Sequence, residues 1–422
     1  MAGDAFAQPA GDASAPPAAP AEEAPPERFS FDVGWRDGPI YEFAGRQPEL
    51  DRIDKVGVVS DLRIRGRVGA SLYLDGGWRH IDGHDDGFKA LVRRARIYTQ
   101  GEILLREWRT EYRFQFAFEG HRFLLNDFYL RWRPTHWVDT IRLGYFDSPI
   151  SLEALASSSS RSMLEVPAAV AAFAPGYRLG IEVADVRQRP SLTWMLNLAS
   201  VGQTQPFTDA SSDTLRAIGR LVWRPVDDPA PDGALLHLGL STSFVLSGGG
   251  DLHYRARPES LLAPYLADTG TIDGDSAFVG LEAAWRRGPL SLMGEMLRSF
   301  IDADEEGSLT FHGLYGQASW ILTGESRPYD PEQAVFDRIV PARPFAPRRG
   351  RWGALELTAR ASWLDLSDGA VHGGHLLTLS AGPAWTWNPW VRLLAGYVFA
   401  HTTDRPDTGE AHILQLRIEL QL

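Results

Sequence analysis

Arginines recur along this chain at spacings that bring their side chains to one face of a strand. Two sets stand out, one spaced by two residues and one by four: Arg63, Arg65, Arg67, and Arg216, Arg220, Arg224. Successive side chains of a strand point to opposite faces, so the members of each set share a face. Guanidinium groups along a polar lumen lower the barrier for an anion, and many moderate sites allow both entry and exit. These residues therefore indicate an anion path, which needs no covalent chemistry.

Each of these arginines has an alternative role as the partner of a carboxylate. Only Lys55 and Lys89 of the 42 basic residues are lysines. Arginine prefers bidentate geometry with phosphate or carboxylate, although a GC-rich genome would also favour arginine. Four glutamates are predicted to face the lumen and are available as partners: Glu111, Glu119, Glu182 and Glu282.

The elements that must position these side chains are strands. In the run from His412 to Leu422, leucine or isoleucine alternates with Gln415, Arg417 and Glu419. The predicted strand at 111–119 repeats the pattern, with aromatic residues on one face and charged or polar residues on the other. A soluble sandwich buries its apolar face, whereas a closed membrane barrel turns that face to lipid and keeps a polar lumen.

Sixteen such strands are predicted, and an even number is typical of bacterial single-chain barrels. They are expected at 61–75, 92–96, 111–119, 127–133, 141–146, 177–183, 191–198, 214–224, 235–245, 277–286, 290–300, 311–322, 354–365, 375–387, 391–401 and 411–422. With a periplasmic N-terminus, the long breaks at 147–175 and 246–275 fall outside the cell. The tight turns at 287–289 and 388–389 fall in the periplasm, and one long segment, 323–352, departs from this rule.

Composition excludes several other classes of protein. The 422 residues include no cysteine, so a disulfide framework and cysteine-based zinc sites or catalysis are excluded. The net charge of −12 argues against nucleic acid as a partner. No stretch approaches the roughly 18 apolar residues of a membrane-spanning helix, so a membrane protein of this sequence must be a barrel.

The predicted domain organisation has three parts. Residues 1–29 form an Ala- and Pro-rich disordered tether, residues 30–60 a lead-in segment, and residues 61–422 the barrel. Ala5-Phe6-Ala7 has the form of a signal-peptidase site but lacks an apolar segment before it. This pattern predicts a secretory signal upstream of Met1 or already removed, and the alternative is an ordinary Ala-rich tail.

Several motifs, taken in order, resemble the phosphate-selective porin O and P family. They are Arg93-Arg94-Ala95-Arg96, Gly144-Tyr145-Phe146-Asp147-Ser148-Pro149, Arg178-Leu179-Gly180, the Leu-Thr-Gly-Glu segment that starts at Leu322, and Gly353-Ala354-Leu355-Glu356-Leu357 with Arg360, Trp363 and Leu366. The resemblance extends from about residue 55 to the C-terminus. It implies an all-β, 16-stranded antiparallel transmembrane barrel in the outer membrane of a Gram-negative bacterium, with an inward-folded third extracellular loop. It also implies a homotrimer and a periplasmic segment tucked into the barrel.

The resemblance further implies a ladder of pore arginines that passes phosphate or polyphosphate inward. Arg67, Arg93 and Arg94 fall where the family has basic pore residues, and Arg161 falls in the expected constriction loop. Arg93 and Arg94 are adjacent, so both cannot point into a regular lumen, and one must lie at a bulge, at the mouth or in a subunit interface. The family also collects anions in a zone of lysines, and this chain, with only two lysines, lacks such a zone.

The expected function is passive diffusion of small anions through the outer membrane, with lipid and anionic solutes as partners and no enzyme activity, cofactor or metal. The segment 80–86 could bind a metal but has no second ligand cluster, so a solvated turn is preferred. The acidic segment 302–307 lacks the spacing of a twelve-residue calcium loop, so an exposed loop is preferred. A general porin with weak or reversed ion preference is an alternative of the same class. A membrane-bound hydrolase, an adhesin-like structural barrel and a soluble β-rich sugar-binding protein are alternatives from other classes.

Overall fold

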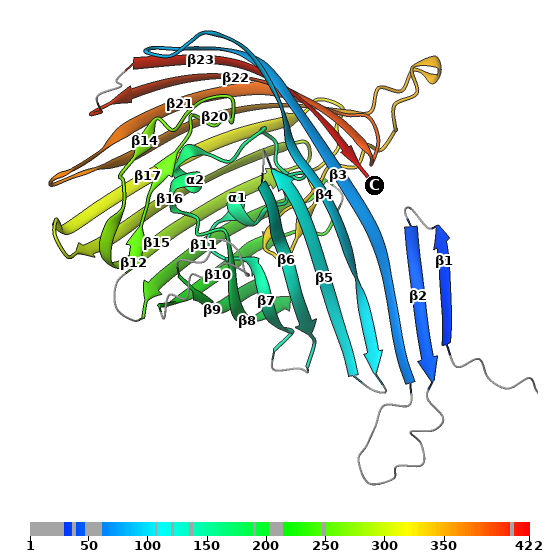
Figure 1. The fold of residues 1–422 in the computed structure, drawn as a ribbon. Coiled ribbons are helices and arrows are strands. Elements are labelled where there is room, and N and C mark those ends of the chain that lie inside the picture. The colour runs from blue at the N-terminus through cyan, green and yellow to red at the C-terminus, as the bar shows by residue number, and fades with distance from the viewer. Residues whose placement is uncertain are drawn as a thin grey trace, which may run out of the picture.

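A computed structural model shows a closed barrel of sixteen antiparallel strands (Figure 1). It describes residues 29–35, 39–46, 61–105, 108–119, 122–134, 138–188, 191–201, 214–230, 232–246, 250–405 and 409–422. The barrel strands are β3 (Asp61–Ile81), β4 (Gly87–Leu105), β5 (Trp108–Glu119), β6 (Arg122–Trp132), β7 (Thr140–Asp147), β8 (Tyr177–Gln188), β9 (Ser191–Ser200), β10 (Leu215–Asp227), β11 (Ala234–Val245), β15 (Ile272–Arg287), β16 (Leu290–Ala303), β17 (Gly307–Ile321), β20 (Ala354–Asp368), β21 (Val371–Thr386), β22 (Val391–Thr403) and β23 (Gly409–Gln421).

Each barrel strand pairs with its neighbour in sequence, and β23 closes the ring on β3. The closing register runs from Ala411 opposite Ile81 to Gln421 opposite Ser71. Closure satisfies the backbone groups of every strand inside hydrocarbon, which an open sheet cannot do. All sixteen predicted strands are therefore confirmed, with longer bounds at many ends, and the closed ring replaces the soluble sandwich alternative.

The alternation predicted for the C-terminal strand holds in β23. Leu414, Leu416 and Ile418 are 56%, 59% and 43% exposed, whereas Gln415 and Arg417 are each 3% exposed. The apolar face therefore points outward, where lipid lies, and the polar face points into the barrel. None of the helices in the part of the chain that the structure describes is long and apolar enough to span a membrane.

Shorter elements lie in the connections and before the barrel. They are β1 (Phe29–Trp35), β2 (Pro39–Arg46), α1 (Leu152–Leu155), α2 (Ala168–Phe173), β12 (Gly250–Leu252), β13 (Arg255–Ala256), β14 (Ala267–Asp268), β18 (Tyr329–Asp330), β19 (Val335–Phe336) and the 3₁₀ turn η2 (Pro347–Arg349). The hairpin β1–β2 pairs with the first part of β3 in the segment expected to be a lead-in. Residues 1–28, which cover all but the last residue of the predicted tether, lie outside the described residues.

An apolar cluster lies inside the half of the barrel where β16 turns into β17 and β20 into β21. Figure 1 shows α1 and α2 within the ring of strands, and Val170 and Phe173 of α2 pack in one buried cluster with Tyr254, Phe311 and Ile413. The cluster also contains residues of the loop between β11 and β15. The polar lumen is therefore confined to the remaining part of the barrel interior.

Candidate functional site

Two adjoining cavities lie along the wall formed by β3 to β7. The larger has a volume of about 980 Å³ and the smaller about 370 Å³. Both are lined by Arg113, Tyr129, Asp330 and Gln333, so they meet at these residues. The barrel wall supplies one side, and the segment that contains β18 and β19 supplies another.

The wall side of these cavities is rich in arginine because the strand register aligns inward-facing residues. Arg65 lies opposite Glu102, Glu102 opposite Glu111, and Glu111 opposite Arg131 on successive strands. A second row joins Arg67 and Arg113 through Gln100. The arginines that line the cavities are, in the larger, Arg65, Arg67, Arg113, Arg131 and Arg133, and in the smaller, Arg94, Arg96, Arg113, Arg142 and Arg161.

Carboxylates accompany most of these arginines. Glu111 accepts hydrogen bonds from Arg131 and from Arg133, the latter at 2.8 Å. Arg142 donates to Glu182 at 2.7 Å, and Arg113 lies 2.9 Å from Asp127. The two walls are bridged where Arg133 donates to Glu332, next to β18, at 3.0 Å. The path therefore alternates positive and negative groups along its length.

Two of the three arginines predicted on the first strand, Arg65 and Arg67, line the larger cavity, and Arg63 does not. Arg63 and Arg65 lie 3.5 and 3.3 Å from Glu42 of the N-terminal hairpin, and both are about half exposed. Arg67 lines the cavity and has no carboxylate within ion-pair distance among the described residues. Arg67 can thus bind an anion without leaving a carboxylate partner, whereas Arg65 is already paired with Glu42.

Arg93 and Arg94 are accommodated by a bulge in β4. The register places Arg94 opposite Tyr73 and Val92 opposite Leu74, so Arg93 is the extra residue. The expectation that one of the two arginines lies at a bulge is confirmed. Both reach Glu119, with Arg94 Nε 2.6 Å and Arg93 Nη1 3.4 Å from its carboxylate oxygens.

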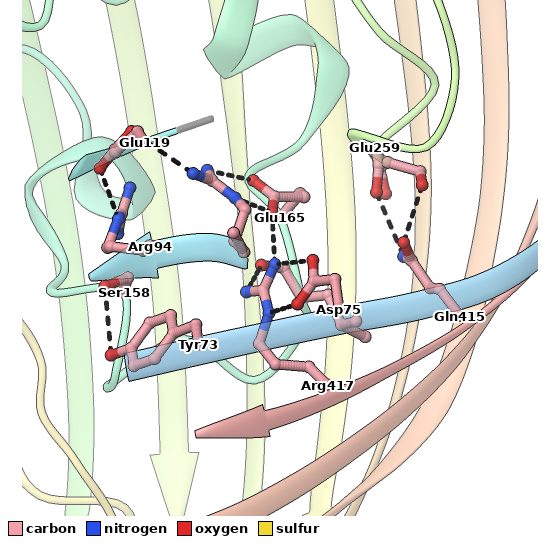
Figure 2. A network of polar contacts seen from close by, with 12 residues as sticks. Tyr73, Asp75, Arg94, Glu119, Ser158, Glu165, Glu259, Gln415 and Arg417 are labelled. Carbon is pink, nitrogen blue, oxygen red and sulfur yellow. Dashed lines mark hydrogen bonds and ion pairs between the residues drawn. The ribbon is translucent and has the colours of Figure 1, made fainter. Parts of the chain in front are cut away.

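Figure 2 shows how this group continues across the barrel interior. Arg93 donates to both oxygens of Glu165, at 2.8 and 3.0 Å, and Arg417 donates to the same carboxylate at 2.5 Å. Arg417 also makes two bonds of 2.7 Å to Asp75 on β3. Burial favours the neutral form of Glu165, but the two arginines outweigh it and hold the pKa of this carboxyl well below its usual range.

Glu165 belongs to the segment 148–176 between β7 and β8, which also contacts inward-facing strand residues. Glu295 of β16 accepts bonds from Ser151 Oγ and from the backbone N–H groups of Leu152 and Glu153. Arg392 donates to the carbonyls of Ser159 and Arg161. The segment is thus fixed at several points inside the ring.

Two inward-facing glycines let this segment pack directly against the strand backbone. A Cβ atom at Gly313 would lie 2.7 Å from Ala169 Cβ, and one at Gly396 would lie 2.9 Å from Leu164 Cδ1. Larger residues at these positions would displace the segment.

Arg161 lies on this segment and lines the smaller cavity. Its guanidinium donates to the carbonyls of Glu153 and Ala154, at 3.3 and 3.1 Å. Among the residues that the structure describes, no carboxylate lies within ion-pair distance of Arg161. Its charge is therefore held in place without being neutralised by direct contact.

The second predicted set lines neither cavity. Arg220 is 2% exposed and donates to Glu282 at 2.7 Å and to the carbonyls of Gln333 and Ala334. Arg224 donates to Thr193 and to Asp227, and Arg216 donates to Ser276 at 3.4 Å. Arg220 and Arg224 therefore take up the alternative role predicted for individual arginines, as partners of nearby polar groups.

Sequence reasoning missed several arginines of the path. Arg131, Arg133 and Arg142 line the cavities but were not singled out. The available signal was a single arginine between apolar residues, as in Leu130-Arg131-Trp132 and Ile141-Arg142-Leu143. Spacing within one strand cannot reveal a row that crosses several strands.

No group of three or more histidine, aspartate or glutamate side chains that could hold a metal ion occurs in the described ranges. The two arginine-lined cavities are therefore the candidate functional site.

The sequence and the fold both relate this chain to known porins. Residues 63–422 match the family described as phosphate-selective porin O and P. Porin O of Pseudomonas aeruginosa is 28% identical over 212 residues, which cover 46% of this chain and 47% of that protein. The chain thus aligns with about half the length of this relative.

Two solved structures share the fold. The anion-selective porin from Comamonas acidovorans is 12% identical, with a TM-score of 0.53 over 85% of this chain and 100% of its own. The trimer form of OmpT, an outer membrane protein of Vibrio cholerae, is 9% identical, with a TM-score of 0.51 over 85% of this chain and 99% of its own. The barrel fold and the outer-membrane location agree with the family match. The chain belongs to the phosphate-selective porin O and P family of outer-membrane barrels.

Proposed function

We propose that this barrel is a channel for passive diffusion of small anions, with phosphate or polyphosphate as the solutes that its family indicates. The observation that carries the proposal is the pair of adjoining cavities bordered by arginines of β3 to β7. Arg67 and Arg161 have a special part in it, since neither has a carboxylate in direct contact among the described residues. Guanidinium groups replace part of the hydration of a passing anion.

The segment 148–176 sets the size limit in this proposal. Its contacts with Glu295, Arg392 and Arg417 support a fixed position beside the smaller cavity. Arg161, which this segment carries into the cavity lining, would be the charge nearest the narrow part of the path.

A general porin with weak ion preference is the second candidate, and a specific observation favours it. The larger cavity is lined by five arginines and by six acidic residues: Asp32, Glu42, Glu102, Glu111, Asp330 and Glu332. Near balance between the two signs would reduce selectivity. The measured ratio of anion to cation permeability decides between the two candidates.

The deciding experiment is single-channel current in a planar bilayer, with the reversal potential in a potassium chloride gradient and phosphate added in steps. Anion selectivity with block at low phosphate concentration supports the first candidate. Arg67→Gln and Arg161→Gln should each lower the selectivity, whereas Arg351→Gln, an exposed residue outside both cavities, is the matched control. Cation-selective or nonselective current would leave only the general porin. No current from inserted barrels would favour a structural or adhesin-like role.

We further propose that the channel is a homotrimer. The family resemblance and the trimer form of a structurally similar porin support this assembly. Mass measurement of the detergent-solubilised protein tests it, and a monomer that conducts like the native protein would contradict it.

A further inference from the structure

A group of histidines lies on the outer surface of the barrel, away from the lumen. Register places Arg298 opposite His312, His312 opposite Asp365, and Asp365 opposite His375, in one row across β16, β17, β20 and β21. The row faces outward, because the residue beside each member in sequence is buried in the interior: Leu297, Phe311, Leu364 and Leu376. With His372 and Asp404 at the strand ends, these residues are here called the outer-rim histidine cluster.

Two carboxylates connect the three histidines. His375 Nδ1 lies 3.1 Å and His312 Nε2 3.5 Å from Asp365, while His372 Nδ1 lies 3.2 Å from Asp404. Hydrogen bonds from Ser367 and His372 lower the pKa of Asp404. All three histidine side chains are accessible, with 36%, 68% and 38% of the side chains of His312, His372 and His375 exposed. They can therefore meet a ligand and exchange protons.

The cluster lies where the apolar outer surface gives way to the polar rim. Below it, Trp363 lies with its ring centre 5.5 Å from that of His312, and Leu314 and Leu377 are exposed. Aromatic side chains border the hydrocarbon region of such barrels. This depth matches the headgroups of the outer leaflet.

The charge of the cluster changes sign with protonation of its histidines. Arg298, Asp365 and Asp404 give a net charge of −1 when the three histidines are neutral and +2 when all are protonated. Neighbouring charged groups are Arg405, whose side chain lies beside Gly374, Asp368, which accepts from Thr310 N, and His401 with Glu410 on the next two strands.

We propose that the outer-rim histidine cluster binds the phosphate headgroup of an anionic outer-leaflet lipid, and that acid strengthens this binding. Arg298 is a permanent cation at one end of the row, and protonated histidines add donors for phosphate oxygens. The exposed Leu314 and Leu377 offer the apolar surface on which the acyl chains of a lipid lie, whereas a free phosphate ion has no use for them. The proposal does not depend on the solute of the channel.

The test uses the full-length barrel in mixed micelles of a neutral phospholipid and phosphatidic acid, a lipid with a phosphomonoester headgroup. Native mass spectrometry then counts the phosphatidic acid retained at about pH 5.5 and about pH 7.5. Retention should rise about tenfold at the lower pH, because each positive charge that the cluster gains strengthens its binding of the anionic headgroup. Equal retention at both pH values would overturn the proposal.

The triple variant His312→Asn, His372→Asn and His375→Asn should lose the pH dependence while it keeps the heat-modifiable gel shift of a folded barrel. His253→Asn is the control, because His253 also pairs with an aspartate, at 2.6 Å from Asp268, but lies in the loop between β11 and β15. Displacement of the lipid by an excess of inorganic phosphate would identify a free-anion site and contradict the lipid assignment. A triple variant with unchanged pH dependence would also contradict it.

Discussion

Arg93 and Glu165 form a bidentate ion pair that joins the bulge of β4 to the segment between β7 and β8. The pair spans 72 residues of sequence, with bonds of 2.8 and 3.0 Å. The bulge makes this contact available, because the extra residue leaves the regular alternation of the strand. The same carboxylate binds Arg417, so one side chain connects the segment with two parts of the wall.

Glu165→Gln should destabilise the barrel by about 3–5 kcal/mol, since two buried arginines would lose a carboxylate. The midpoint of the heat-modifiable gel shift should fall, and open-channel current noise should rise as the segment loosens. Glu305→Gln, an exposed substitution in the loop after β16, is the control. Unchanged midpoint and noise would show that Glu165 does not hold the segment.

The depressed pKa of Glu165 also sets a pH window. Because the folded-state pKa lies below the ordinary value of about 4.3, the contribution of Glu165 is present above that pH and is lost as pH falls through the folded-state pKa. The midpoint difference between wild type and Glu165→Gln should therefore be large at about pH 7 and shrink only under strongly acidic conditions. A midpoint difference that stays constant from about pH 7 down to about pH 2 would mean that folding does not lower the pKa of Glu165.

Glu153 should behave in the opposite way. Burial raises the pKa of this α1 carboxyl, and Arg360 and Arg161 offset the effect only in part. Ionisation of Glu153 at neutral pH therefore costs stability, so Glu153→Gln should stabilise the barrel by about 1–2 kcal/mol near pH 7. The gain should shrink as the pH falls and disappear at about pH 3, where the carboxyl is largely neutral in both the folded and the unfolded state. A loss of stability at pH 7 would contradict this account.

Gly313→Val should displace α2, because the new side chain would collide with Ala169. Overpacking of this kind costs about 1–3 kcal/mol, and the shift should change single-channel conductance. Gly316→Val provides a matched control in the same strand, since a Cβ at Gly316 meets nothing within 4 Å. Equal conductance in the two variants would argue that the position of α2 does not affect the path.

Arg220 and Arg161 should separate stability from selectivity. Arg220→Met removes the partner of buried Glu282 and should cost about 3–5 kcal/mol without changing the reversal potential, because Arg220 lines neither cavity. Arg161→Met should lower anion selectivity while the free energy of unfolding changes by less than about 1 kcal/mol. If Arg220→Met changed the reversal potential and Arg161→Met did not, the anion path would lie on the other side of the lumen.

The fold was largely predictable because alternation is a local property. In β23 the pattern of leucines against Gln415, Arg417 and Glu419 suffices to define both faces of the strand. The same alternation predicted the sixteen strands and the membrane barrel, and the family motifs implied the same fold. The hairpin of β1 and β2 was not predicted, although β1 alternates apolar with polar or small residues, because its place depends on the edge of β3 that β23 leaves free.

The candidate site was predictable only in part. Arg67 and Arg161 were found from spacing and from the resemblance, and both line a cavity. Arg220 was indistinguishable from them in sequence, because its burial depends on Gln333 and Ala334, more than a hundred residues away. Spacing within a strand shows which side chains point to the same face. Packing of distant segments decides whether those side chains remain accessible from the lumen.

The seam between β23 and β3 has a consequence for biogenesis. It pairs Gln421 with Ser71, so the first and last strands of the ring must find each other across almost the whole chain. Until they do, two strand edges carry unpaired amide and carbonyl groups that hydrocarbon cannot solvate. A partly inserted chain therefore needs temporary partners for both edges, and formation of the seam is the step that releases the finished barrel into the lipid.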